Sequence, residues 1–166
     1  MNYWIITDTH FGHDKVVEYC GRPDNFAELI LKRLKPRVMP GDVVIHLGDV
    51  CIGNDEAWHQ RLMSGLVGKK WLIKGNHDKK TNSWYLDHGW DFVADSIKIR
   101  LFGLDIVLSH IPVVDNGFDI NIHGHFHNSD HHRHEPELQA VKTAKHRLVF
   151  MEHEYQPLNL RGIVSR

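Results

Sequence analysis

Five short apolar segments of this chain are each followed at once by carboxylate, imidazole or amide side chains. The polar endings are, in order, Asp8-Thr9-His10, Gly48-Asp49, Gly75-Asn76-His77-Asp78, Ser109-His110 and Gly124-His125-Phe126-His127. Short apolar runs bounded by polar residues predict buried strands, and open α/β sheets place their chemistry at the carboxyl ends of such strands. Chance explains one or two endings of this kind, so five in 166 residues predict convergence on one site.

Three of these endings carry a glycine just before the polar residue of interest, namely Gly48, Gly75 and Gly124. Glycine allows sharp turns that residues with a Cβ atom resist. We therefore expect each glycine to aim the following side chain back over the edge of the sheet.

The remaining pattern alternates strands and helices in the first half of the chain and holds mostly strands in the second. Apolar spacing predicts helices over residues 25–38 and 54–66, capped by Asp24 or Asn25 and by Asn54 or Asp55. Strands are expected at residues 3–6, 42–47 and 71–73, as a hairpin over 96–110, within 118–125, and within 147–160, where Pro157 would stop the last one. This order favours an α/β protein with a mixed sheet or sheets.

Length and composition fit one globular domain over residues 1–166. The chain is 42% hydrophobic and 25% charged, as in soluble proteins, and its formal net charge of −1 gives no basic footprint for duplex nucleic acid. No stretch is long enough to span a membrane, and the N-terminus does not resemble a signal peptide. Two cysteines give no disulfide framework, so a cytoplasmic location is expected. The composition does not distinguish a monomer from an oligomer.

The converging side chains are two aspartates, one asparagine and four histidines of the fifteen in the chain. They are Asp8, His10, Asp49, Asn76, His110, His125 and His127. Carboxylate, imidazole and amide ligands without a thiolate suit Mn, Fe, Co, Ni or Zn, and manganese is our first expectation. Seven ligands are too many for one tetrahedral zinc ion. They suit two adjacent ions bridged by a carboxylate, which activate a bridging water and stabilise an in-line displacement at phosphorus.

The same residues closely resemble the motif series of the calcineurin-like metallophosphoesterase family. That series reads D-x-H, G-D, G-N-H-D/E, a lone H and G-H-x-H, and here it spans residues 8 to 127. The resemblance implies a four-layer α-β-β-α sandwich, with two mixed sheets packed face to face and flanked by helices. It also implies two ligand sets, Asp8, His10 and His127 for one metal, and Asn76, His110 and His125 for the other, with Asp49 as the bridge.

The resemblance further implies roles for residues that would not hold metal. His77 would face the substrate phosphate and protonate the leaving oxygen or stabilise charge, and Asp78 would orient it. The segment from His10 to Pro23 resembles a small bacterial and phage-type branch of the family, in which an arginine reaches the phosphate. Arg22 is the candidate here, and the alternative is a surface arginine before a turn. Many members read G-D-x-x-D, whereas Ile52 stands at the last position here.

The leading hypothesis is a dinuclear metal-dependent phosphoesterase that hydrolyses its ester through a hydroxide bridging the two metals. The short chain shows no cap domain, which favours an open site and a small phosphodiester or nucleotide-type substrate. The alternatives are a phosphomonoesterase, a metal-binding module without turnover, and a histidine-rich metal-storage protein. A module without turnover would be expected to lose His77 or a ligand, and this chain keeps them all. The polar, histidine-rich segment 128–135 is expected to be an exposed loop.

Overall fold

The computed structural model of this protein describes residues 1–128 and 135–165. Its strands are β1 (Tyr3–Ile6), β2 (Val43–His46), β3 (Lys69–Ile73), β4 (Phe92–Ala94), β5 (Ser96–Leu101), β6 (Leu104–Ser109), β7 (Ile120–His123), β8 (His146–Leu148) and β9 (Leu158–Asn159). Its helices are α1 (Lys15–Cys20), α2 (Phe26–Leu34), the 3-10 helix η1 (Lys35–Arg37), α3 (Asp55–Met63), α4 (Asn82–Asp87), α5 (Pro136–Val141) and α6 (Leu160–Val164). Most of the predicted histidine-rich loop lies outside the described residues.

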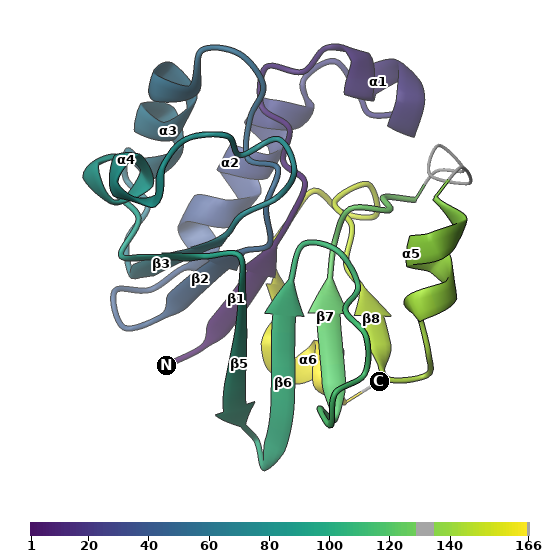
Figure 1. Cartoon of the computed structure of the whole chain (residues 1–166). Coiled ribbons are helices and arrows are strands. Elements are labelled where there is room, and N and C mark those ends of the chain that lie inside the picture. The colour runs from purple at the N-terminus through teal and green to yellow at the C-terminus, as the bar shows by residue number, and fades with distance from the viewer. Residues whose placement is uncertain (129–134, 166) are drawn as a thin grey trace.

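The strands form two mixed sheets, which confirms the expected fold class. The first sheet has the order β4-β3-β2-β1-β9, in which only the short β9 runs antiparallel to its neighbour. The second has the order β5-β6-β7-β8, in which the β5–β6 hairpin is antiparallel and the other pairs are parallel. Helices α2, α3 and α4 cover the outer face of the first sheet, whereas α5 lies beside β8 (Figure 1). In the described part of the chain, the helical layer expected on the outer face of the second sheet is therefore represented only by the short α5.

Two hydrophobic cores follow from the alternation of side chains along the strands. In β2, Val43 and Ile45 point into the core between the sheets, while Val44 points toward the helices. The core between the sheets also holds Ile106 and Ile122 of the second sheet, both fully buried. Burial of each such side chain contributes about 1.5–3 kcal/mol, so this core fixes how the two sheets face each other.

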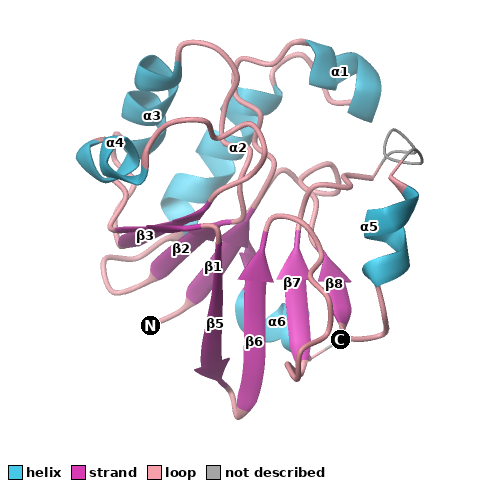
Figure 2. Cartoon of the chain, in the orientation of Figure 1, coloured by secondary structure: helices cyan, strands magenta, loops and turns pink. Residues whose placement is uncertain are grey.

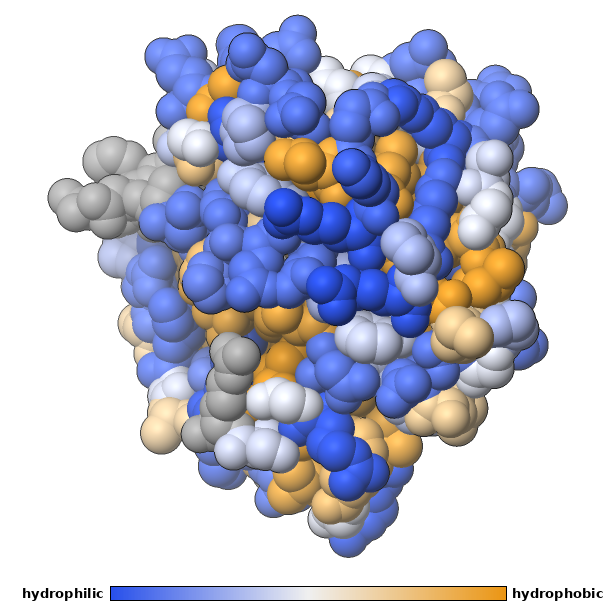
Figure 3. Space-filling view, turned by 180° about the vertical axis from the view of Figure 1, so that it is seen from behind, coloured by the Kyte–Doolittle hydropathy of each residue, from blue (hydrophilic) through white to orange (hydrophobic). Residues whose placement is uncertain are grey.

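The surface away from these cores is mostly hydrophilic. Seen from behind, hydrophilic residues dominate the molecule, and hydrophobic residues form smaller patches among them (Figure 3). Within residues 1–128 and 135–165, every helix is too short or too polar to cross a bilayer.

Most expected elements are present, and one expectation is wrong. The predicted helices correspond to α2 and α3, which begin after Asn25 and Asn54, and the predicted hairpin turns at Phe102–Gly103. The late strand does not run up to Pro157. Instead, β8 ends at Leu148 and the edge strand β9 begins directly after the proline. A proline at the start of an edge strand leaves no ladder hydrogen bond unmade.

The parallel strands bring distant loops to one edge of the molecule. The carboxyl ends of β6, β7 and β8 point toward a group of connecting loops (Figure 2). Backbone hydrogen bonds tie these loops together, since Asp8 N donates to Gly48 O at 2.9 Å and Gly124 N donates to His110 O at 3.0 Å. The segments after β1 and β2 are therefore held side by side, and so are the segments after β6 and β7.

The three motif glycines serve this edge in two ways. Gly48 has a φ of +97°, as expected for a sharp turn, and a Cβ atom there would lie 2.4 Å from Gly75 N. Gly75 and Gly124 lie outside the left-handed region and are required for space instead. A Cβ atom added at Gly75 would lie 2.2 Å from Asp49 Oδ1. A Cβ atom added at Gly124 would lie 2.1 Å from Thr7 Oγ1.

We expect Gly48→Ala to destabilise the fold far more than Gly117→Ala. Gly117 has nearly the same φ, +95°, but open space around it, so alanine there should cost about 1–2 kcal/mol of backbone strain. At Gly48 the clash with backbone adds to that strain, for a total loss of about 3 kcal/mol or more. Urea unfolding followed by circular dichroism measures both, and equal losses would contradict the close approach of the two loops.

Candidate metal centre

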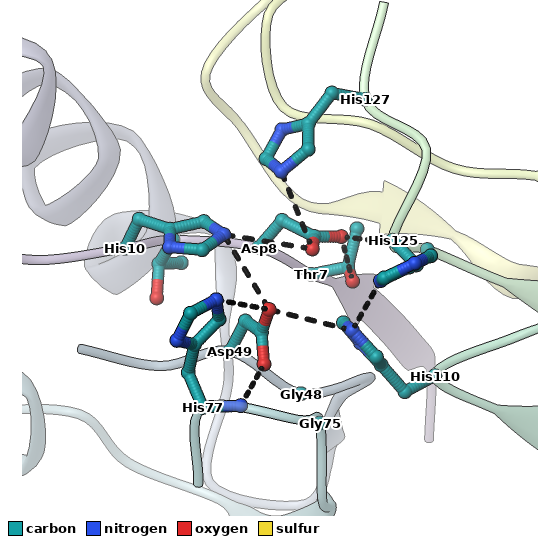
Figure 4. Close-up of polar contacts among 12 residues, drawn as sticks. Thr7, Asp8, His10, Gly48, Asp49, Gly75, His77, His110, His125 and His127 are labelled. Atoms are coloured by element: carbon teal, nitrogen blue, oxygen red, sulfur yellow. Dashed lines mark hydrogen bonds and ion pairs between the residues drawn. The ribbon is translucent and has the colours of Figure 1, made fainter. Parts of the chain in front are cut away.

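All seven predicted ligands meet at the shared edge of the two sheets. Figure 4 shows six of them, and the seventh, Asn76, lies 3.0 Å from His110 through its Oδ1 atom. Asp8 and His10 follow β1, Asp49 follows β2, Asn76 follows β3, His110 follows β6, and His125 and His127 follow β7. Each therefore comes from the loop at the carboxyl end of a strand. The structure brings together side chains that the sequence separates by as many as 119 positions, from Asp8 to His127.

The donor atoms lie in two groups. In the first group, Asp8 Oδ1 lies 3.8 Å from His10 Nε2 and 3.6 Å from His127 Nε2. In the second, His110 Nε2 lies 3.0 Å from Asn76 Oδ1 and 3.2 Å from His125 Nδ1. Two ligands of one ion, each bound at about 2.1 Å, are separated by roughly 3 Å. Both groups therefore have dimensions that suit a small divalent cation.

Asp49 lies between these two groups. Its Oδ2 atom is 3.6 Å from His10 Nε2 and 3.4 Å from His110 Nε2, and Figure 4 shows it reaching toward both rings. Its other oxygen, Oδ1, accepts a hydrogen bond from the His77 backbone N–H at 2.8 Å. One oxygen is thus fixed by the chain, and the other faces the centre of the site.

The two carboxylate oxygens of Asp8 also have different surroundings. Its Oδ2 atom accepts hydrogen bonds from Thr7 Oγ1 at 2.6 Å and from the His125 backbone N–H at 3.0 Å. Its Oδ1 atom and both ring nitrogens of His10 are buried without a hydrogen-bond partner among the described residues. A buried polar atom left unpaired costs about 1–3 kcal/mol. A bound cation would satisfy Asp8 Oδ1 and one His10 nitrogen together, so these residues fit a metal.

The backbone at the site is strained. Five of the seven residues have left-handed φ values, namely Asp8 (47°), His10 (46°), Asp49 (57°), His125 (72°) and His127 (49°). Aspartate and histidine tolerate this region better than most residues, but each instance still costs about 1–3 kcal/mol. Such strain persists only where the surrounding structure holds it in place, and it is typical of functional sites.

The two carboxylates draw positive charge to the site. Burial lowers the pKa of His127, but the Asp8 and Glu152 carboxylates outweigh this effect and raise the pKa to about 10. Burial likewise lowers the pKa of His110, but Asp49 and Asp8 raise it to about 9. Both shifts arise because a cation is favoured beside these buried carboxylates.

His77 stands at the entrance of the site, and its ring is not among the buried groups. Its side chain is 43% exposed, with Nε2 at 3.9 Å from Asp49 Oδ2 and its ring centroid 5.4 Å from that of His10. The ring therefore faces the open side of the site, while the backbone N–H of the same residue is bonded to Asp49.

The expectation that Asp78 orients His77 is wrong. All three hydrogen bonds of the buried Asp78 carboxylate go to backbone N–H groups, those of Asp49, Val50 and Gly75. Burial raises the pKa of Asp78 to about 6. Asp78 thus connects the loops after β2 and β3 and does not contact the His77 ring.

Arg22 does not take either position considered for it. It is 3% exposed, which rules out a surface arginine, and its guanidinium donates to the carbonyls of Asp8 and Thr9 and to the Glu152 carboxylate. Glu152 in turn lies at Nδ1 of His127, whereas Asp8 Oδ1 lies nearest to Nε2 of the same ring. The arginine therefore supports the site from behind and does not line the cavity over the metal ligands.

A cavity of about 200 Å³ opens over the ligands. Part of its wall comes from α1, through Val16, Tyr19 and Cys20, and part from His13 and His77. Sequence reasoning did not predict α1, because a six-residue helix ended by a left-handed Gly21 is too short to show helical periodicity. A second cavity of about 380 Å³ shares Asn76 with the first as a lining residue.

Two glutamates at the site were also not predicted. Glu152 Oε1 lies 2.9 Å from His127 Nδ1, and Glu135 Oε2 lies 2.8 Å from His125 Nε2. Glu135 follows no predicted strand, and Glu152 lies inside the segment where the late strand was expected, so the search for polar residues after strand ends could not find them.

Comparisons with known proteins agree with this geometry. The family model described as calcineurin-like phosphoesterase matches residues 1–157. An uncharacterised protein of Methanocaldococcus jannaschii is 28% identical over 98% of this chain and 89% of its own length. The gene 66 protein of Mycobacterium phage L5 is 28% identical over 95% of this chain and 94% of its own length.

A solved structure is also similar over nearly the whole chain. It is a protein of unknown function from Aquifex aeolicus, with a TM-score of 0.77 and 26% identity, and the match covers 99% of this chain and 98% of that one. Since the family model covers almost all of the sequence, and every motif position lies within it, the chain belongs to the calcineurin-like phosphoesterase family, whose members are metal-dependent.

Proposed function

We propose that this protein is a dinuclear metal-dependent phosphodiesterase acting on a small diester or nucleotide-type substrate. The observation that carries this proposal is the position of Asp49 Oδ2 between two groups of donor atoms, each of a size to hold one ion. When bound, two such ions activate a water molecule and neutralise charge on the phosphate. Asp8, His10 and His127 would hold one ion, Asn76, His110 and His125 would hold the other, and Asp49 would contact both. Manganese is the ion we expect.

The protein's own contribution at the reacting end is His77. Its ring is exposed to the cavity, near the side chains that would bind the phosphate. Imidazole carries or gives up a proton near neutral pH, which suits it to protonate a leaving oxygen. The hydrogen bond from His77 N to Asp49 Oδ1 fixes the position of the His77 backbone relative to the carboxylate that would contact both ions.

The shape of the site supports a diester over a monoester. Asn76 lines both cavities, so a phosphate held beside it would have a cavity available for each of two substituents. One cavity is walled by Val16 and Tyr19, the other by Lys74 and Ile111. A diester carries two substituents and uses both spaces, whereas a monoester uses one.

A metal-reconstitution assay tests the proposal. Protein stripped by a chelator should be inactive, and added Mn²⁺ should restore hydrolysis of bis(p-nitrophenyl) phosphate in preference to p-nitrophenyl phosphate. Asp49→Asn should lose binding of both ions and turnover with them. Asp91→Asn is the matched control, because Asp91 also accepts a backbone N–H, from Lys70 at 2.8 Å, but is exposed and lies at the start of β3, whereas the ligand Asn76 follows its end.

Each alternative activity has its own result in this assay. Preference for the monoester would make the protein a phosphomonoesterase. Tight metal binding without hydrolysis of either ester would indicate a module without turnover. Full activity of the chelated protein would contradict the metal-dependent reaction itself.

We expect His77→Ala to keep both metals and to slow turnover of an alkyl diester by roughly 10²–10⁴-fold, the usual contribution of a positioned acid. The loss should be smaller for a nitrophenyl ester, because that leaving group needs little protonation. Metal content by elemental analysis and rates on the two esters provide the measurement. His13→Ala is the comparison, since His13 lines the same cavity and its loss should affect both esters equally.

Two outcomes would count against proton donation by His77. Equal losses on both esters would assign the residue to phosphate binding or charge stabilisation. Loss of a metal ion in the variant would make His77 a ligand.

A further inference from the structure

A buried ion pair between Arg22 and Glu152 stands directly behind one of the two ligand groups. The side chains are 0% and 1% exposed, and Arg22 Nε donates to Glu152 Oε1 at 2.8 Å. A buried ion pair is not a reliable source of stability, because desolvation of both charges offsets their attraction. The contacts that each partner makes beyond the pair are therefore of interest.

Glu152 fixes the ring of His127. Its Oε1 atom lies 2.9 Å from His127 Nδ1, and an ionised carboxylate only accepts hydrogen bonds, so Nδ1 carries the proton. This leaves His127 Nε2 as the nitrogen that faces Asp8 Oδ1, at 3.6 Å. A carboxylate bonded to the outer nitrogen of a metal-binding histidine sets its tautomer and orientation, and typically changes metal affinity by 10–100-fold.

Arg22 holds the other two members of the same group. Its guanidinium donates to the backbone carbonyls of Asp8 at 2.8 Å and of Thr9 at 3.1 Å. These carbonyls lie between two left-handed residues, Asp8 and His10. Arg22 thus supports the strained turn that points both side chains at the site.

The same place does not suit a further metal ion. Donor atoms of Cys20, His127 and Glu152 lie close enough together to hold one. However, Arg22 bonds Glu152 Oε1, and its Nη2 atom lies 3.4 Å from His127 Nδ1. The guanidinium already supplies the positive charge there, and a second cation would be repelled.

We propose that Arg22 and Glu152 are positioning residues for one ion of the pair, the one held by Asp8, His10 and His127. All three of these ligands contact the Arg22–Glu152 pair, directly or through the turn that carries them. The contacts of Arg22 and Glu152 do not extend to Asn76, His110 or His125. This inference rests on the proposed function, since it assumes that the two groups bind metal.

The second ligand group has a different support, which provides an internal comparison. His125 Nε2 lies 2.8 Å from Glu135 Oε2, and the Glu135 side chain is 38% exposed. Water screens such a pair more than the buried one. Glu152 and Glu135 should therefore affect different ions, and Glu152 should have the larger effect.

The test is calorimetric titration of Mn²⁺ into the metal-free full chain. Wild-type protein should bind two ions. Glu152→Gln should weaken one of the two binding steps by 10–100-fold and leave the other within about 3-fold. Glu135→Gln should weaken the other step, and by less. Glu28→Gln is the matched control, because Glu28 pairs with Arg61 on the surface, and it should change neither step.

A second measurement uses the wild-type protein, so that the inference can be tested even if the Glu152 variant does not fold. In Zn²⁺-loaded protein, nitrogen NMR of His127 should show a proton on Nδ1 and metal on Nε2. A proton on Nε2, or equal weakening of both steps by Glu152→Gln, or no weakening, would overturn the inference while the two-metal proposal stood. Wild-type protein that bound no metal would overturn the proposed function first and this inference with it.

Discussion

Two buried carboxylates, Asp8 and Asp49, stand at the edge where the two sheets meet, and the rest of the site is arranged around their charge. Each has one oxygen bonded by donors of the chain and one turned toward the centre. Buried anions are costly unless a cation compensates them. The carboxylates raise the pKa values of His110 and His127, whereas burial outweighs Asp49 at His10 and lowers the pKa of that ring to about 2. A neutral His10 beside charged carboxylates suits a metal ligand.

The fold serves this requirement through the direction of its strands. Parallel pairing delivers the ends of β1, β2 and β3 to the edge from one sheet, and the ends of β6 and β7 from the other. The core between the sheets holds the two sets of ends at a fixed separation. The strained turns at the ligands are tolerated because Asp78, Arg22 and the close approach of Gly48 to Gly75 hold them in place.

Much of this site could be predicted because its signal is local. A polar residue directly after a buried strand is visible in the sequence, and Asp8, Asn76 and His110 all follow that rule. Glu152 and Arg22 do not, because their roles depend on a contact across 130 positions between loops of no regular pattern. The partners of Asp78 could not be predicted, because a carboxylate beside His77 in sequence can turn either to that ring or to the next loop, and here it turns to the loop after β2. The sheets followed from apolar runs, whereas short α1 and the strand after Pro157 left too few residues for a periodic pattern.

Anomalous X-ray scattering at the manganese edge, from crystals grown with Mn²⁺, would test most directly whether the two donor groups are two metal sites. We expect two peaks about 3.5–4 Å apart, one among Asp8, His10 and His127, the other among Asn76, His110 and His125, with Asp49 Oδ2 in contact with both. A single peak, or two peaks of which only one contacts Asp49, would contradict the dinuclear centre.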